Sequence, residues 1–79
     1  MHKRLLIIAR DFNEARHWAQ KRRLSPGQWI YASSYHNIRG NAGSEYVLLG
    51  EWAQRVDSSL LLSELKEHGC TEQIRNSVA

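Results

Sequence analysis

Short apolar runs alternate with helix-forming segments along the chain, and this alternation limits its possible folds more than any other feature. The runs at residues 4–9, 29–33 and 46–49 are rich in Leu, Ile, Val and aromatic side chains, as buried strands are. Segments with apolar residues at helical spacing follow the first and third runs. Strands that alternate with helices predict a parallel sheet joined by right-handed crossovers.

The first helix is expected at residues 12–23. Asp11, followed three residues later by Glu14, is typical of a capping box, and Asn13 is the alternative cap. The helix should end before Pro26, because the residue that precedes a proline avoids the helical conformation. One amphipathic helix therefore connects the first two strands.

A short helical turn at residues 35–39 and a helix at residues 59–68 complete the predicted order, β-α-β-(short α)-β-α. This order defines an α/β fold, a miniature Rossmann-like domain with a small, mostly parallel three-stranded sheet. The connection between the second and third strands is short, so an antiparallel third strand remains an alternative. We expect residues 1–69 to form this single domain and residues 70–79 to form a loosely ordered C-terminal tail.

The predicted core consists of apolar side chains from the strands and the two longer helices. Its members are Leu6, Ile8, Trp18, Ile30, Leu48 and Leu65. A three-stranded sheet leaves its edge strands unpaired, and open edges favour association. The sequence therefore also predicts a homodimer.

Length and composition exclude several classes of protein. The chain has 79 residues, enough for one domain, and it is 42% hydrophobic, too high for a disordered chain. No apolar run approaches the roughly 18 residues of a membrane span, and the apolar stretch near the N-terminus is too short for a signal peptide. We expect a soluble cytoplasmic protein without membrane contact.

The charge is unevenly distributed along the chain. Residues 1–40 carry eight basic side chains against two acidic ones, whereas residues 41–79 carry three against six. Basic clusters are typical of surfaces that contact nucleic-acid phosphates. The candidate nucleic-acid surface lies on the first helix and its end: Arg16, Lys21, Arg22 and Arg23.

Polar side chains follow the predicted strands at their carboxyl ends, where open parallel sheets bind ligands. The turn after the first strand has no glycine, so the nucleotide motifs G-x-G-x-x-G and G-x-x-x-x-G-K-S/T are absent. The remaining interpretation is a site for an anion or a protein partner at this edge. Its candidate residues are Arg10, Ser33, Arg39, Trp52 and Arg55. In the alternative, Arg10 pairs with a nearby carboxylate and the serines only cap helices.

No constellation of catalytic or metal-binding residues is present in the sequence. The four histidines lack the H-x-x-x-H and H-E-x-x-H spacings of zinc sites. Cys70, the single cysteine, follows a helix end, which does not activate a thiol. We expect no catalytic residues, no metal and no cofactor, and therefore no enzymatic activity.

Three tryptophans are many for so small a chain. Trp18 shares a helix face with Ala15 and should be in the core, and Trp29 begins the second strand. Trp52 is expected to be a surface anchor for a partner, and its alternative role is a lid over the core.

The segments that carry a resemblance to known proteins are Leu5-Leu-Ile-Ile-Ala-Arg10, Glu14-Ala15, Trp18-Ala19, Leu24-Ser25, Trp29-Ile-Tyr-Ala-Ser33, Ile38-Arg39-Gly40, Val47-Leu-Leu-Gly50 and Trp52. With this pattern, over about residues 4–69, the chain resembles small uncharacterised proteins encoded by actinobacterial phages. The resemblance implies a phage accessory protein in the host cytoplasm and no particular activity. A weaker resemblance is to the first half of the second RecA-like domain of helicases, whose nucleotide motifs have no counterpart here.

These observations together predict a small non-enzymatic binding protein. It should act through protein–protein contacts at the carboxyl edge of its sheet, with a host or phage protein as partner. The alternative is a protein that binds nucleic acid or a phosphate-bearing ligand through Arg10, Arg39 and the basic helix.

Overall fold

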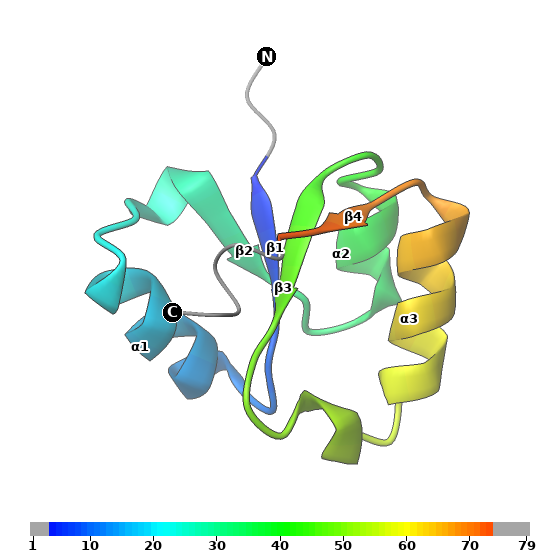
Figure 1. Ribbon diagram of the computed structural model, residues 1–79, viewed down its shortest axis with the longest axis horizontal. Coiled ribbons are helices and arrows are strands. Elements are labelled where there is room, and N and C mark those ends of the chain that lie inside the picture. The colour runs from blue at the N-terminus through cyan, green and yellow to red at the C-terminus, as the bar shows by residue number, and fades with distance from the viewer. Residues whose placement is uncertain (1–3, 74–79) are drawn as a thin grey trace.

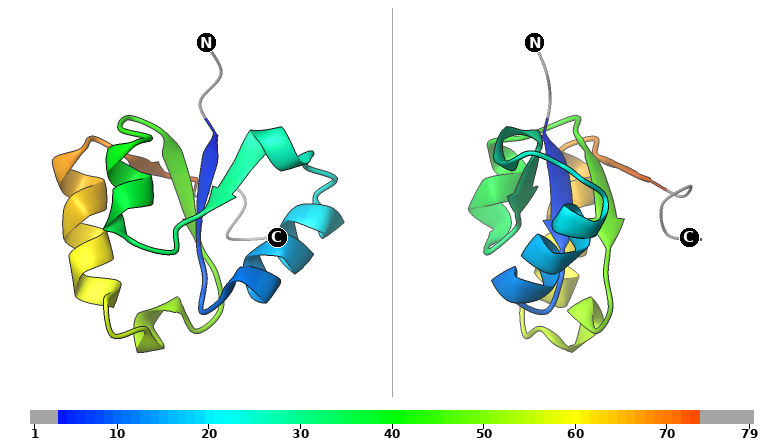
Figure 2. Two further views of the ribbon diagram at one scale, coloured as in Figure 1. Left: turned by 180° about the vertical axis from the view of Figure 1, so that it is seen from behind. Right: turned by 90° about the vertical axis from the view of Figure 1, so that its left-hand side faces the viewer.

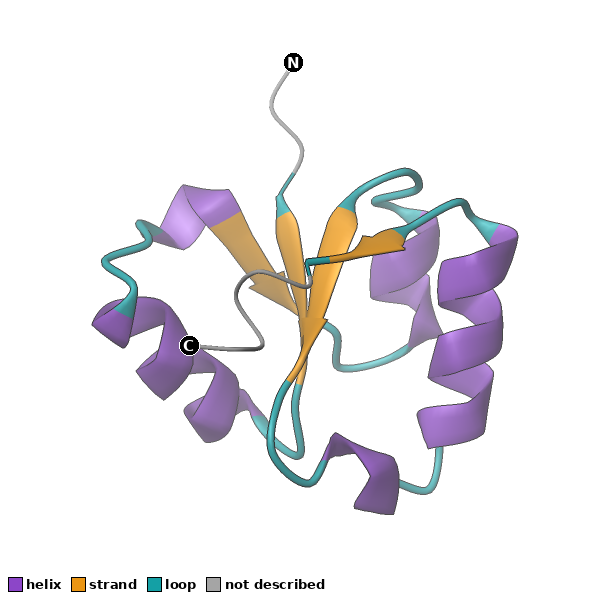
Figure 3. Cartoon of the chain, viewed as in Figure 1, coloured by secondary structure: helices purple, strands orange, loops and turns teal. Residues whose placement is uncertain are grey.

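The computed structural model describes residues 4–73, which form one parallel sheet with helices on both faces (Figures 1 and 3). The strand order is β2-β1-β3-β4, so β1 and β3 are central and β2 and β4 are the edges. All three pairs of neighbouring strands are parallel. The strands are β1 (Leu5–Ile8), β2 (Trp29–Tyr31), β3 (Glu45–Leu48) and β4 (Thr71–Glu72).

Three helices cover the sheet, with α1 against one face and α2 and α3 against the other (Figure 2). Two short 3₁₀ turns, η1 (Pro26–Gln28) and η2 (Trp52–Gln54), precede β2 and α3. The side chain of Asp11 caps α1, as the capping-box spacing predicts. The helices are α1 (Phe12–Lys21), α2 (Tyr35–Arg39) and α3 (Ser58–Glu67).

The α/β fold with a parallel sheet is confirmed, and β3 is parallel to β1. The prediction of three strands is wrong, because Thr71 and Glu72 form a fourth strand beside β3. Gly69, with φ +70°, ends α3 and turns the chain back toward the sheet. β4 has only two residues, both exposed, so it has no apolar run by which the sequence could predict it. The rest of the predicted tail, residues 74–79, lies outside the described residues.

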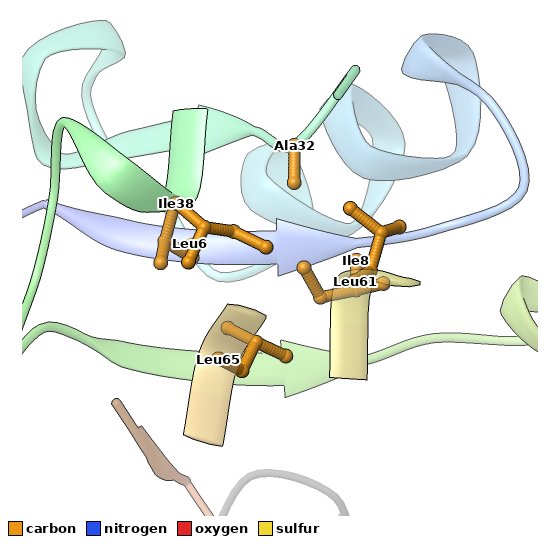
Figure 4. Packing of buried hydrophobic residues seen from close by; sticks show 6 residues of the cluster. All are labelled: Leu6, Ile8, Ala32, Ile38, Leu61 and Leu65. Carbon is orange, nitrogen blue, oxygen red and sulfur yellow. The ribbon is translucent and has the colours of Figure 1, made fainter. Parts of the chain in front are cut away.

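Alternating residues of β1 divide the core into two layers. Leu6 and Ile8 face α2 and α3 (Figure 4), whereas Ile7 faces α1. All three side chains are fully buried because strands flank β1 on both sides and helices cover both of its faces. The larger layer consists of Leu6, Ile8, Ala32, Ile38, Leu61 and Leu65.

The predicted core residues divide into two groups. Leu6, Ile8 and Leu65 are buried, as expected. Trp18, Ile30 and Leu48 are only partly buried and pack against the margins of the two layers. Ile30 is less covered because β2 is an edge strand with no neighbour on its outer side.

Candidate functional site

The loops that follow β1 and β3 meet at the carboxyl edge of the sheet, where the strand order reverses. Arg10, in the loop after β1, donates a hydrogen bond from its guanidinium to Glu51, in the loop after β3, at 3.0 Å. The carboxylate of Asp11 lies 3.6 Å from the same guanidinium. The charge of Arg10 is therefore compensated by two carboxylates of its own chain.

Glu14 occupies the space between these two loops. Its carboxylate accepts a hydrogen bond from the backbone N–H of Arg10 at 2.9 Å and lies against Gly50. Its own backbone N–H donates to the side chain of Asp11 at 2.9 Å. Carboxylates thus lie at the helix N-terminus where a sheet of this kind would bind an anion.

Gly50→Ala should lower the free energy of unfolding by about 1–3 kcal/mol, because φ at this residue is +51° and a Cβ would overlap the carboxylate of Glu14. The matched control is Gly27→Ala, since a Cβ at residue 27 would meet nothing within 4 Å. Urea denaturation measures both effects. An unchanged midpoint for Gly50→Ala would contradict this packing of Glu14.

Arg55 ties together the carboxyl ends of β1 and β2. Its Nη1 donates to the carbonyl oxygens of Ala9 at 3.0 Å and Ala32 at 2.8 Å, and its Nη2 donates to that of Ser33 at 3.1 Å. Its Nη2 also pairs with Asp57 at 2.9 Å, and its side chain is only 9% exposed. Arg55 lies at the predicted edge, but its donors are engaged within the chain.

Ser33 and Trp52 also lie on the carboxyl side of the sheet, and both have structural contacts. The Ser33 hydroxyl donates to the side chain of Asn37 at 2.9 Å, next to the start of α2. Trp52, in η2, is partly buried and packs against the core layer that faces α3. This packing matches the lid alternative for Trp52.

Arg39 is the one candidate residue that the fold does not bring to this edge. It is the last residue of α2, which leads away from the carboxyl end of β2. Its Nε donates to Glu64 of α3 at 2.7 Å, and its guanidinium lies 4.6 Å from the centroid of the Tyr35 ring. The expectation that Arg39 adjoins Arg10 and Arg55 is therefore wrong, because Arg39 joins α2 to α3 instead.

The hydrogen bond from Arg39 holds the pKa of Glu64 below its usual value. Because the pKa of Glu64 is lower in the folded chain, the pair stabilises the fold fully at pH values above the pKa of an unfolded glutamate, about 4.3. This contribution is lost as the pH falls through the pKa of Glu64 in the folded chain. Wild type should therefore lose stability more steeply than Glu64→Gln below about pH 4. Urea midpoints at neutral and acidic pH measure this, and equal losses would contradict it.

An apolar groove runs along β2, at the free edge of the sheet. Phe12 is 51% exposed at its rim. The centroid of its ring lies 6.0 Å from those of Trp29 and Tyr31. The guanidinium of Arg55 lies 5.5 Å from the Tyr31 ring centroid, so the groove adjoins the carboxyl edge. The groove has a volume of about 550 Å³ and is lined by Phe12, Pro26, Trp29, Ile30, Tyr31 and Ser33.

Sequence reasoning missed this groove, although it predicted the first helix and the second strand, which supply most of its lining. Helical spacing places Phe12 on the apolar face of α1, together with Ala15 and Ala19. Phe12 is the first residue of α1, however, and it reaches the open edge of β2 rather than the covered centre of the sheet. The sequence feature that could have indicated the groove is an aromatic residue at a helix start, Phe12, together with a strand that contains Trp29 and Tyr31.

The basic residues of the candidate nucleic-acid surface lie on α1 and in the turn after it. Arg16, Lys21 and Arg23 are exposed, and no carboxylate within residues 4–73 forms an ion pair with them. The guanidinium of Arg22 lies 5.0 Å from the centroid of the Trp18 ring. Both residues line a cavity of about 750 Å³ near the amino ends of β1 and β3.

Three further observations concern the class of the protein. Within the described part of the chain, no cluster of three or more His, Cys, Asp or Glu side chains is placed to hold a metal ion. No helix among residues 4–73 is long and apolar enough to cross a membrane. No family model, curated protein or solved structure matches the chain.

Proposed function

We propose that the protein is a small non-enzymatic binding protein that acts through protein–protein contacts at the carboxyl side of its sheet. The proposed contact surface is the groove along β2, with Phe12, Trp29 and Tyr31 as its aromatic residues. The half-exposed ring of Phe12 is the observation that supports this function most directly.

The chemistry of the two neighbouring surfaces favours a protein partner over an anion. At the carboxyl edge, Arg10 and Arg55 already pair with carboxylates of the chain. The groove beside them is lined by aromatic and aliphatic residues together with Ser33, and no charged residue is part of its lining. Exposed apolar patches of this kind mark protein interfaces, and aromatic residues supply much of the binding energy there.

The proposal includes an accessory role in the cytoplasm of a phage host. This part rests on the resemblance to proteins of actinobacterial phages and on no contact within the molecule. The partner is then a host or phage protein with an apolar segment that fits the groove.

Capture from a nuclease-treated host lysate tests the proposed surface. Tagged wild type should retain a partner that Phe12→Glu loses, because the charge would have to be buried at the interface. Phe12→Glu should still fold, since Phe12 is half exposed and an acidic residue suits the first turn of a helix. Leu60→Glu is the matched control, because Leu60 is 45% exposed on α3.

Two outcomes would overturn the proposed surface. One is equal capture of the same partner by Phe12→Glu and wild type, with both proteins folded by circular dichroism. The other is loss of the partner in Leu60→Glu alone, which would move the interface to α3.

A second candidate function is nucleic-acid binding through the basic residues of α1. It is favoured by Arg16, Lys21 and Arg23, whose exposed charges have no carboxylate partner within residues 4–73. Fluorescence anisotropy with a labelled oligonucleotide tests it, because phosphate contacts weaken steeply as salt rises. Binding that is salt-dependent and lost when Lys21 and Arg23 are both changed to Gln would favour this function over the first.

A further inference from the structure

The outer side of β2 pairs with no other strand of the described chain. Ala32 donates its N–H to the carbonyl of Ile7, so Ile30 and Ala32 point their backbone groups toward β1. In an extended strand the intervening residues, Trp29 and Tyr31, then point theirs to the free edge. Of these outward groups, the Tyr31 carbonyl accepts a hydrogen bond from the Ser33 N–H at 3.0 Å, and no strand within residues 4–73 pairs with this side of β2.

The two edge strands of the sheet differ in how well they are protected against pairing with another strand. β4 consists of Thr71 and Glu72, two exposed polar residues, and a charged side chain discourages pairing at an edge. β2 consists of a tryptophan, an isoleucine and a tyrosine, all only partly buried, and the aromatic groove runs beside it. β2 is therefore the edge suited to accept another strand.

We propose that the strand added to this edge is β2 of a second copy, paired antiparallel across a two-fold axis at Ile30. The outward residues, Trp29 and Tyr31, are symmetric about Ile30, so Trp29 of each copy faces Tyr31 of the other. Such a pair exchanges two N–H to C=O hydrogen bonds, in which the Tyr31 carbonyl accepts through its second lone pair, beside its bond from Ser33. The symmetry makes two such pairs. The two four-stranded sheets become one continuous sheet.

The same pairing covers the partly buried aromatic side chains of β2. Trp29 and Tyr31 point to the face of the sheet that α1 covers, whereas Ile30 points to the opposite face. Across the two-fold axis, each tryptophan becomes the direct cross-strand neighbour of a tyrosine. Phe12, which packs on both rings within one copy, lies beside these two cross-strand pairs.

The charge distribution of α1 is compatible with this symmetry. A two-fold axis perpendicular to the sheet places both copies of α1 on one face, running antiparallel. The acidic start of one helix, at Asp11 and Glu14, then lies toward the basic end of the other, at Lys21 and Arg23. Opposed helix dipoles and opposite charges favour this arrangement.

This inference rests on the proposed function, because it assigns a second copy as a partner of the same groove. Sedimentation equilibrium of the full chain should give a mass approaching twice 9.2 kDa at about millimolar concentration. Phe12→Glu should raise the dissociation constant at least about tenfold. Leu60→Glu should leave it unchanged, since Leu60 lies on α3, away from β2.

Hydrogen exchange followed by NMR distinguishes strand pairing from simple association of apolar side chains. The amides of Trp29 and Tyr31 should exchange slowly in concentrated samples and rapidly after dilution. A strict monomer at about millimolar concentration overturns the proposal, as does a dimer in which these two amides stay unprotected. A monomer that still captures a partner through Phe12 would overturn only the dimer and leave the proposed function intact.

Discussion

Ile8→Ala should lower the free energy of unfolding by about 2–5 kcal/mol. Ile8 is fully buried in β1 and packs in the layer that includes Leu61 and Leu65. The substitution removes three carbon atoms and leaves a cavity that the surrounding strands and helices close only in part. A domain of this size has only about 5–10 kcal/mol of stability in total, so the loss is a large fraction.

Urea or guanidinium denaturation, followed by circular dichroism, measures this effect. Leu62→Ala is the matched control, because Leu62 is 41% exposed on α3 and its truncation should change stability by about 0.5 kcal/mol or less. Equal unfolding midpoints for Ile8→Ala and wild type would mean that β1 is not the centre of the core.

Arg55→Met is the second substitution with a large expected effect, a loss of about 2–4 kcal/mol. The guanidinium donates hydrogen bonds to the carbonyl oxygens of Ala9, Ala32 and Ser33. Methionine fills a similar volume but leaves these acceptors, and the carboxylate of Asp57, without their donor. The result should be a less stable domain with loosened carboxyl ends of β1 and β2.

Arg55→Lys provides the control for charge. Lysine keeps the positive charge, but its single ammonium group cannot bond several carbonyls as the guanidinium fork does. Arg55→Lys should therefore be less stable than wild type and more stable than Arg55→Met in the same denaturation experiment. If Arg55→Met has the stability of wild type, Arg55 is available for a ligand, and the structural role argued from its contacts is wrong.

The sequence predicts most of the fold because each central element has a strong local pattern. The apolar run of β1 and the capped, amphipathic α1 were placed within two residues of their observed ends. β4 could not be predicted, because two exposed residues, Thr71 and Glu72, have no apolar pattern. Their pairing depends on where Gly69 directs the chain after α3, which is a tertiary property.

The candidate site was predicted less well, for a different physical reason. Arg10, Ser33 and Arg55 lie on the carboxyl side of the sheet, as their positions after strand ends indicate, because the strands are parallel. Sequence position does not reveal which charges the chain already compensates, as Glu51 and Asp57 do for the two arginines. Sequence position also does not reveal that the ring of Phe12 is left half exposed, because this exposure depends on β2 being an edge strand.

The central claim is that the groove along β2 is the binding surface. Hydroxyl-radical footprinting of the captured complex, read by mass spectrometry, tests it most directly. Binding should protect Phe12, Trp29 and Tyr31 from oxidation and leave Leu60 and Leu62, both exposed on α3, as reactive as in the unbound protein. Unchanged oxidation of the three aromatic rings, with protection of Leu60 or Leu62 instead, would contradict the claim.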